Sequence, residues 1–196
     1  MADFDISFRK LDAAEGKWVL DPRDSGGETY RGISRRNWPK WDGWKAIDLV
    51  RHGMGDAPKY GTGKYVDYVV RLNDILNKDT WLQERVRDFY IANFWTQSYT
   101  LIEDQDLVDW MFSLAVNTGM SPNGKSLPHK WVQQALGGIV ADGIIGPVTR
   151  KAIKDTFDVK VLLEGAKAYA RTFYRDLVKR DPSKKCYLKG WLRRVG

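Results

Sequence analysis

The stretch that decides the fold is Glu15–Ile33, with the sequence EGKWVLDPRDSGGETYRGI. It places one carboxylate, Glu15, directly before a glycine, and a second, Asp24, in a run of turn-forming residues that includes the pair Gly26–Gly27. Glycine, proline and aspartate between short runs of β-branched and aromatic residues are typical of hairpins. We therefore expect turns and short strands over residues 18–36.

On both sides of this stretch the sequence predicts helices. Apolar residues recur at helical spacing over residues 4–16, which places Glu15 near the end of a first helix. Residues 37–63 read as irregular, with Trp38, Trp41 and Trp44 at helical spacing and the short segment Ala46–Arg51 after them. Apolar stripes and terminal Asp, Gly and Pro residues then predict helices at 65–76, 80–94, 104–118, 128–136, 147–157 and 159–180. The predicted fold class is α+β, predominantly α-helical, with a small β-hairpin region beside a helical body and the apolar helix 104–118 at its centre.

Length and composition limit the kinds of protein that this chain can form. Its 196 residues, 43% of them hydrophobic, suit one domain or one domain with a small annex. The single cysteine, Cys186, excludes an internal disulfide, and neither His52 nor His129 has neighbours at ligand spacing, so we expect no metal and no organic cofactor. No apolar stretch is long enough to span a bilayer, and the polar N-terminus predicts no signal peptide.

A net charge of +7 favours an anionic partner, which nucleic acid, an anionic membrane or a cell-wall polymer would provide. The basic residues are spread along the chain, apart from a denser stretch after Arg171, and a solvated surface explains them equally well. In the C-terminal tail, basic residues alternate with aromatic ones. We favour a docked terminal helix there, with surface contact to membrane or wall as the alternative; the tail residues are Lys184, Lys185, Tyr187, Lys189, Trp191, Arg193 and Arg194.

Two carboxylates in contrasting surroundings suggest glycosidic bond cleavage. That reaction needs a proton donor whose pKa is raised by partial burial, and a second, ionised carboxylate. Glu15 has apolar neighbours, including Trp18, whereas Asp24 is flanked by charged and polar residues. The alternatives are a solvated helix end for Glu15 and a turn-forming aspartate for Asp24.

The pattern E-G-x-W-x-x-D-P-x-D-x-G-G-E-T-x-x-G-I resembles glycoside hydrolase family 108, whose members are N-acetylmuramidases found as phage endolysins and as bacterial muramidases tied to protein release. The resemblance continues in order along nearly the whole chain. One departure is Lys17-Trp18, where the family often has Gly and Tyr. The further matching segments are Phe94-Trp95, Asp109–Gly119, Val132–Leu136, Asp142–Pro147 and Lys189–Val195.

The resemblance implies a lysozyme-like fold in which Glu15 is the catalytic acid. The spacing Glu15-x8-Asp24-x5-Tyr30 is also similar to the E-x8-D-x5-T triad of phage lysozymes, where the Asp and Thr position and activate a water. Here Tyr30 stands at the threonine position and Thr29 directly precedes it. Either hydroxyl fits this role, and register with Gly32-Ile33 favours Tyr30.

Four further residues are candidates for substrate binding. Glu28, Thr29 and Arg31 follow the double glycine. Glu28 has an equally plausible structural role, as an ion-pair partner of Arg31. Asn117 either binds the N-acetyl group of the substrate or ends its helix before Gly119.

These expectations combine into one functional hypothesis. Residues 1–96 form the catalytic part, and residues 97–196 a helical, peptidoglycan-binding-like part packed with it as one globular unit. The protein cleaves the β-1,4 bond between N-acetylmuramic acid and N-acetylglucosamine, as a monomeric endolysin that waits in the bacterial cytoplasm for a holin and binds no nucleic acid. The alternatives are a lytic transglycosylase acting on the same bond and a non-catalytic wall-binding module, and release through a host secretion route is the alternative to a holin.

Overall fold

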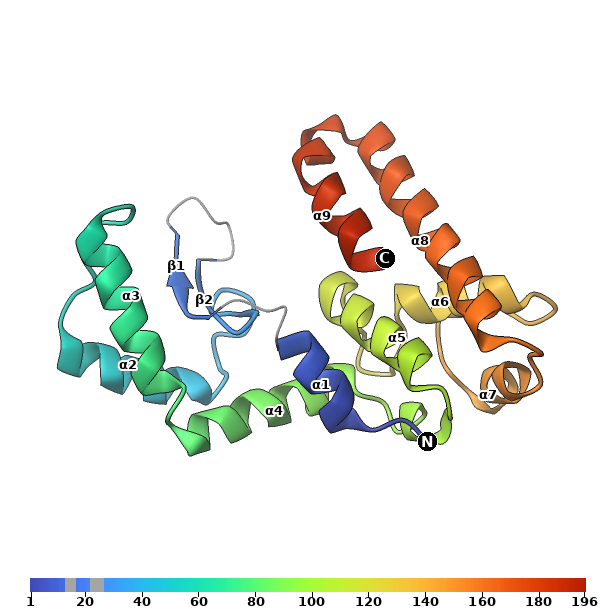
Figure 1. The fold of residues 1–196 in the computed structure, drawn as a ribbon, viewed down its shortest axis with the longest axis horizontal. Helices are drawn as coiled ribbons and strands as arrows, with labels where there is room; N and C mark the ends of the chain where they lie inside the picture. The colour runs from blue at the N-terminus through green and yellow to red at the C-terminus, as the bar shows by residue number, and fades with distance from the viewer. Residues whose placement is uncertain (13–16, 22–26) are drawn as a thin grey trace. The chain divides into compact units, whose positions relative to one another are not determined.

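The computed structural model describes residues 1–12, 17–21 and 27–196 (Figure 1). Within these residues a short three-stranded sheet follows the first helix, and the rest of the chain is helical. The elements are α1 Phe4–Asp12, β1 Val19–Leu20, β2 Glu28–Tyr30, β3 Ile33–Ser34, α2 Gly43–Met54, α3 Gly63–Leu76, α4 Thr80–Phe94, the 3₁₀ helix η1 Tyr99–Leu101, α5 Gln105–Thr118, α6 Leu127–Leu136, α7 Pro147–Lys154, α8 Val159–Arg180, the 3₁₀ helix η2 Pro182–Lys184 and α9 Lys185–Val195.

The chain forms two compact units. Phe8–Ala92 makes up the first, which we call the sheet unit, and Met1–Ser7 together with Asn93–Gly196 makes up the second, the helical unit. The limits of the units therefore fall inside α1 and α4. Among the described residues, no helix combines the length and the apolar composition that crossing a membrane requires.

The sheet unit contains an antiparallel sheet with the strand order β1-β2-β3. The strands fall within residues 18–36, which confirms the hairpin prediction. The prediction that residues 37–63 are mostly irregular is wrong for Gly43–Met54, which form α2. Trp44 and Ile47 are buried on one face of α2, and this short apolar stripe stabilises a longer helix than the turn-rich flanking sequence suggested.

The helical unit is built around α5, whose seven buried side chains confirm the predicted central helix. Asp104 accepts a hydrogen bond from the backbone N–H of Leu107 and so caps the start of α5, and Gly119, with φ 88°, ends it. Helices α6, α8 and α9 contact α5, and α7 contacts α6 (Figure 1). The indole N–H of Trp110 donates to the carbonyl of Val195, which joins α5 to the docked terminal helix α9.

Polar side chains fix the turn between α6 and α7. The Gln133 amide donates to Asp142, to the Ile144 carbonyl and to Thr149, while its oxygen accepts from the Gly143 N–H. Gly143 has φ 84°, and a Cβ there would lie 2.9 Å from the Ser126 carbonyl oxygen. The turn therefore requires glycine at this position.

His129 is fully buried in the same region. Its Nδ1 lies 3.0 Å from the Gly143 carbonyl oxygen and its Nε2 lies 2.5 Å from the Tyr99 hydroxyl. In a neutral ring, Nδ1–H donates to the carbonyl and Nε2 accepts from the hydroxyl. Burial lowers the pKa of His129 to about 4, although hydrogen bonds to the Gly143 and Gly124 backbone and the charge of Asp142 oppose the shift.

This shift predicts a specific pH dependence of stability. An unfolded histidine titrates near pH 6.5, so between pH 6.5 and 4 the unfolded chain binds a proton that the folded chain does not. The stabilisation from neutral His129 is therefore complete above pH 6.5 and is lost as the pH falls toward 4, at a cost of about 3 kcal/mol. Urea unfolding from pH 7 to 4 gives the free energy of unfolding of the wild type and of His129→Gln. The difference between the two pH profiles is the contribution of His129. Parallel pH profiles for the two proteins would contradict it.

Candidate active site

The two predicted catalytic carboxylates, Glu15 and Asp24, lie outside the described residues. Their neighbours in the chain are described. Leu11 and Trp18 are buried on either side of the segment that contains Glu15. Asp24 falls, in sequence, in the connection between β1 and β2, where Leu20 pairs with Glu28 across the two strands. The residues on either side of the two predicted carboxylates are therefore what the structure describes of the candidate site.

Glu28 is the centre of a buried ionic cluster. Only 8% of the residue is exposed, and its two carboxylate oxygens meet cations from different segments. Oε1 accepts from Arg51 of α2 at 3.0 Å and from the indole N–H of Trp18 at 2.7 Å. Oε2 lies 2.6 Å from Nε of Arg35, which follows β3. Two arginines and an indole therefore neutralise and solvate the carboxylate in place of water.

Further contacts hold the partners of Glu28 in position. Arg35 also forms a bidentate ion pair with Asp48 of α2, which brings two carboxylates and two guanidinium groups together. The Arg51 guanidinium lies over the Trp18 ring, 5.4 Å from its centroid. The backbone N–H of Trp18 donates to the buried amide of Asn73 in α3. The cluster therefore connects the segment after Glu15, strand β2 and helices α2 and α3.

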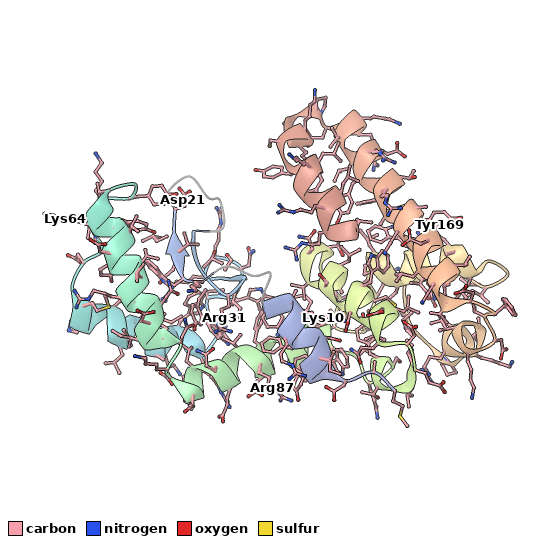
Figure 2. The ribbon with its side chains drawn as sticks, in the orientation of Figure 1. Lys10, Asp21, Arg31, Lys64, Arg87 and Tyr169 are labelled. Atoms are coloured by element: carbon pink, nitrogen blue, oxygen red, sulfur yellow. The ribbon has the colours of Figure 1, made fainter. Side chains whose placement is uncertain are left out.

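These contacts bear on the two roles predicted for Glu28. The cationic partners of this buried carboxylate are Arg35 and Arg51 instead of Arg31. Arg31 donates to the side-chain oxygen of Asn77 and belongs to the turn between β2 and β3 (Figure 2). The prediction that Glu28 pairs with Arg31 is wrong, because that turn leads the Arg31 side chain to the end of α3.

The turn at Arg31-Gly32 is a two-residue hairpin with positive φ at both positions, 45° and 76°. Such turns match the twist of antiparallel strands, but a non-glycine residue with positive φ is strained. The Tyr90 hydroxyl donates to the Arg31 carbonyl at 2.6 Å and so helps to hold this conformation. Arg31 therefore has a conformational role in the turn in addition to its positive charge.

The two candidate hydroxyls, Thr29 and Tyr30, are in different environments. Tyr30 has no exposed surface, and its hydroxyl accepts a hydrogen bond from Gln83 at 3.0 Å. Its strand partner Ile33 is also fully buried. Thr29 is half-buried, and its hydroxyl donates to the Gly27 carbonyl at 3.3 Å. Alternate residues of a strand point to opposite faces, so a strand that buries Tyr30 presents Thr29 on its other face.

Two tyrosines support the outer strand of the sheet. The Tyr65 hydroxyl donates to the Leu20 carbonyl and accepts from the Leu20 N–H, at 2.9 and 3.0 Å. The Tyr60 hydroxyl donates to Asp21 at 2.7 Å (Figure 2 labels Asp21 at the end of β1). The two bonds of Tyr65 satisfy the backbone groups of Leu20 that a further strand would otherwise bind, and the bond of Tyr60 holds the residue that follows the strand.

Asn117 belongs to the other compact unit. It is exposed near the end of α5, and its side-chain oxygen accepts from the Tyr174 hydroxyl at 3.2 Å. The contact that the structure gives for Asn117 is therefore with α8, within the helical unit. Among the described residues, no group of histidine, cysteine, aspartate and glutamate side chains is arranged to hold a metal ion.

Sequence reasoning missed the residues that support this site: Arg35, Arg51, Asn73 and Tyr65. Of these, only Asn73 could have been suspected from the sequence, because it is a polar residue next to the apolar stripe of α3. The structure shows that it is 2% exposed. A buried amide on such a face must find hydrogen-bonding partners, which here are Trp18 and Val69. The two arginines resemble ordinary surface residues in the sequence.

Helices beside a small antiparallel sheet that carries an acid-bearing stretch define an α+β protein of the lysozyme-like class. The chain belongs to the glycosyl hydrolase 108 family, whose model matches residues 8–119. A second family model, described as a predicted peptidoglycan domain, matches residues 127–196. The protein is therefore a peptidoglycan hydrolase, a glycoside hydrolase of the N-acetylmuramidase type, which confirms the resemblance identified in the sequence.

A comparison with solved structures supports the fold. The chain is similar to the structure of Brucella abortus SagA, with a TM-score of 0.58 and 18% sequence identity. The similarity covers 98% of this chain and 88% of that one, so it extends over both compact units. No curated protein sequence matches the chain.

The ionic cluster predicts a large effect of a small substitution. Glu28→Gln keeps the shape of the side chain but leaves Arg51 without an acidic partner, and Arg35 with Asp48 alone. We expect a loss on the order of 2 kcal/mol in the free energy of unfolding, since both arginines are partly exposed. Urea unfolding measures this loss.

Asp42→Asn is the matched control, because Asp42 is an exposed carboxylate that pairs with the exposed Lys45. Its removal is expected to have no measurable effect on stability. Equal stability of the two variants would contradict a structural role for Glu28.

Proposed function

We propose that Glu15 protonates the leaving oxygen of the β-1,4 bond between N-acetylmuramic acid and N-acetylglucosamine, and that Asp24 remains ionised and stabilises positive charge or activates water. The observation that carries this proposal is the ionic cluster at Glu28. Because that carboxylate is buried and paired with two arginines, it is not available as a proton donor. Glu15 and Asp24 are then the carboxylates of the motif best suited to the two catalytic roles.

The described structure supports a fixed position for both ends of the catalytic stretch. Trp18, three residues after Glu15, is bonded to Glu28 through its indole and to Asn73 through its backbone. The connection that includes Asp24 begins after a strand held by Tyr65 and ends at Glu28. Catalytic groups act most efficiently when their surroundings are preorganised, and these contacts provide such surroundings.

For the third catalytic group we propose Thr29 instead of Tyr30, which the sequence register had favoured. Tyr30 is fully buried and its hydroxyl is already bonded to Gln83, so it cannot reach a substrate or a catalytic water without unpacking the sheet. Thr29 lies on the other face and is partly exposed. Thr29 also supplies the residue type of the phage lysozyme pattern, one residue before the position that Tyr30 occupies.

We propose that the sheet unit carries the catalytic chemistry and that the chain after about residue 97 contributes wall binding, in line with the division expected from the sequence. The protein then acts as a monomeric endolysin that lyses its host after a holin releases it from the cytoplasm. It binds glycan strands of peptidoglycan and no nucleic acid. The basic residues of α9 give weak contact with anionic wall or membrane surfaces.

The first test is Glu15→Gln, which removes the proton donor without changing the size of the side chain. We expect the rate at which permeabilised Gram-negative cells are cleared to fall by about 10² or more, with an unchanged unfolding midpoint. Glu84→Gln, at a position of α4 far along the chain from the catalytic stretch, is the control and should retain full activity. Clearing that survives Glu15→Gln would overturn the assignment of the acid.

The same wall digest separates hydrolysis from the transglycosylase alternative. A hydrolase adds water and leaves reducing N-acetylmuramic acid ends, whereas a lytic transglycosylase leaves anhydro ends. We expect mass spectrometry of the products to give reducing ends. Anhydro ends as the main product would contradict hydrolysis.

The choice between the two hydroxyls has its own test. Thr29→Val removes a hydroxyl that faces away from the core, and we expect kcat to fall by at least about tenfold with little loss of stability. Tyr30→Phe removes one buried hydrogen bond, and we expect a stability loss of about 1 kcal/mol with kcat preserved. The reverse outcome, in which Tyr30→Phe alone abolishes activity, would restore Tyr30 as the catalytic group.

A further inference from the structure

A cavity of about 510 Å³ lies in the helical unit, and neither the catalytic proposal nor the ionic cluster involves it. The segment from η1 to the start of α5 lines one part of it, and α7 and the first residue of α8 line the rest. Its volume is in the range of sites that bind small molecules or short peptides. The cavity joins residues from both matched families, since its first part falls within residues 8–119 and its second within residues 127–196.

Helix α7 supplies positive charge to the cavity. The Arg150 guanidinium is half-buried and is oriented by two neutral acceptors, the Ser98 hydroxyl at 3.1 Å and the Ile145 carbonyl at 3.4 Å. Lys154 lies one turn further along the helix and is exposed. Among the described residues, no carboxylate forms an ion pair with either of them, whereas Lys151 pairs with Asp155. Two positive charges at the cavity are therefore available to a ligand.

The segment before α5 supplies negative charge to the same cavity. Asp104 uses its carboxylate to cap α5, where it accepts from the Leu107 N–H at 2.8 Å. Glu103 is exposed, and within the described part of the chain no cation forms an ion pair with it. The cavity thus has groups of both signs that do not pair with each other. A ligand that carries both a carboxylate and an ammonium group would satisfy both.

The other residues that line the cavity favour a peptide over a sugar as its ligand. Leu101, Ile153 and Val159 contribute aliphatic surface, and none of the described residues that line the cavity is aromatic. Sugar rings are usually bound by stacking on aromatic side chains, whereas short peptides offer aliphatic groups, carboxylates and amines. An isolated phosphate would leave Glu103 unpaired and would be repelled by it.

We propose that this cavity binds the peptide stem of peptidoglycan, with stem carboxylates on Arg150 and Lys154 and a stem ammonium group on Glu103. The inference rests on the proposed function only in taking peptidoglycan as the polymer that the protein meets. A stem residue that ends in both an amine and a carboxylate, such as diaminopimelate, matches the charges best. Binding the stem would hold the enzyme on cross-linked wall beside the glycan that it cuts.

The test uses the full chain and a probe without sugar, the free tetrapeptide L-Ala-γ-D-Glu-meso-diaminopimelate-D-Ala. Isothermal titration calorimetry should give saturable binding to the wild type. Arg150→Gln and Lys154→Gln should each weaken it by at least about tenfold, because each removes a charge-assisted hydrogen bond. Lys130→Gln, an exposed change on α6 outside the cavity, is the control and should bind as the wild type does.

A second probe tests the ammonium assignment. Acetylating the side-chain amine of diaminopimelate should weaken binding to the wild type, and Glu103→Gln should bind the two peptides equally. If Glu103→Gln still discriminates between them as the wild type does, the role of Glu103 is overturned. The whole proposal is overturned if the wild type does not bind the tetrapeptide, if both α7 variants bind it unchanged, or if inorganic phosphate binds as tightly.

Peptide binding is independent of catalysis, because the tetrapeptide contains no glycosidic bond. Glu15→Gln should bind the tetrapeptide with wild-type affinity even when it no longer clears cells. Loss of peptide binding with intact hydrolysis would reject the cavity and leave the proposed function standing. If the wild type binds the tetrapeptide and Glu15→Gln still clears cells at the wild-type rate, the catalytic assignment alone is rejected.

Discussion

The sheet unit depends on the neutralisation of one buried carboxylate. Glu28 is almost completely removed from water, and an unpaired charge in that position would cost several kcal/mol. Arg51 reaches it from α2 and Arg35 reaches it from the segment after β3, while Trp18 adds an indole donor. One electrostatic requirement therefore joins four separate segments of the chain at strand β2.

A three-stranded sheet with strands of two or three residues is too small to be stable by itself. Here the helices provide the missing support through hydrogen bonds from side chains. Tyr65 of α3 holds β1, Tyr90 of α4 holds the turn after β2, and Gln83 of α4 holds Tyr30. The three strands are therefore held in place by helices that follow them in the chain, and one of these helices, α4, binds the hydroxyl of the buried Tyr30 through Gln83.

The helical unit is stabilised differently. Its helices pack through apolar side chains, and a few polar side chains buried among them have their hydrogen bonds satisfied. His129 and Gln133 are both buried on α6, and both bind the backbone of the turn at Gly143. That turn leads into α7, which lines the cavity proposed to bind the peptide stem. A polymeric substrate offers many weak contacts, and a second binding site in the same chain raises the effective concentration of the enzyme at its substrate.

The sequence by itself determined most of the helices, though not α2, together with the hairpin region, the family and the acids Glu15 and Asp24 as candidates, because periodicity, caps and motif spacing are local properties. It identified α5 through its apolar residues and through Gly119. Only the tertiary structure decided that Glu28 is buried against Arg35 and Arg51, and that Tyr30 is buried in the core while Thr29 is partly exposed. Both outcomes depend on which side chains from other segments contact the sheet. The residues next to a glutamate in the chain do not show which arginines will pair with it, and a strand of three residues is too short to show which of its faces is buried.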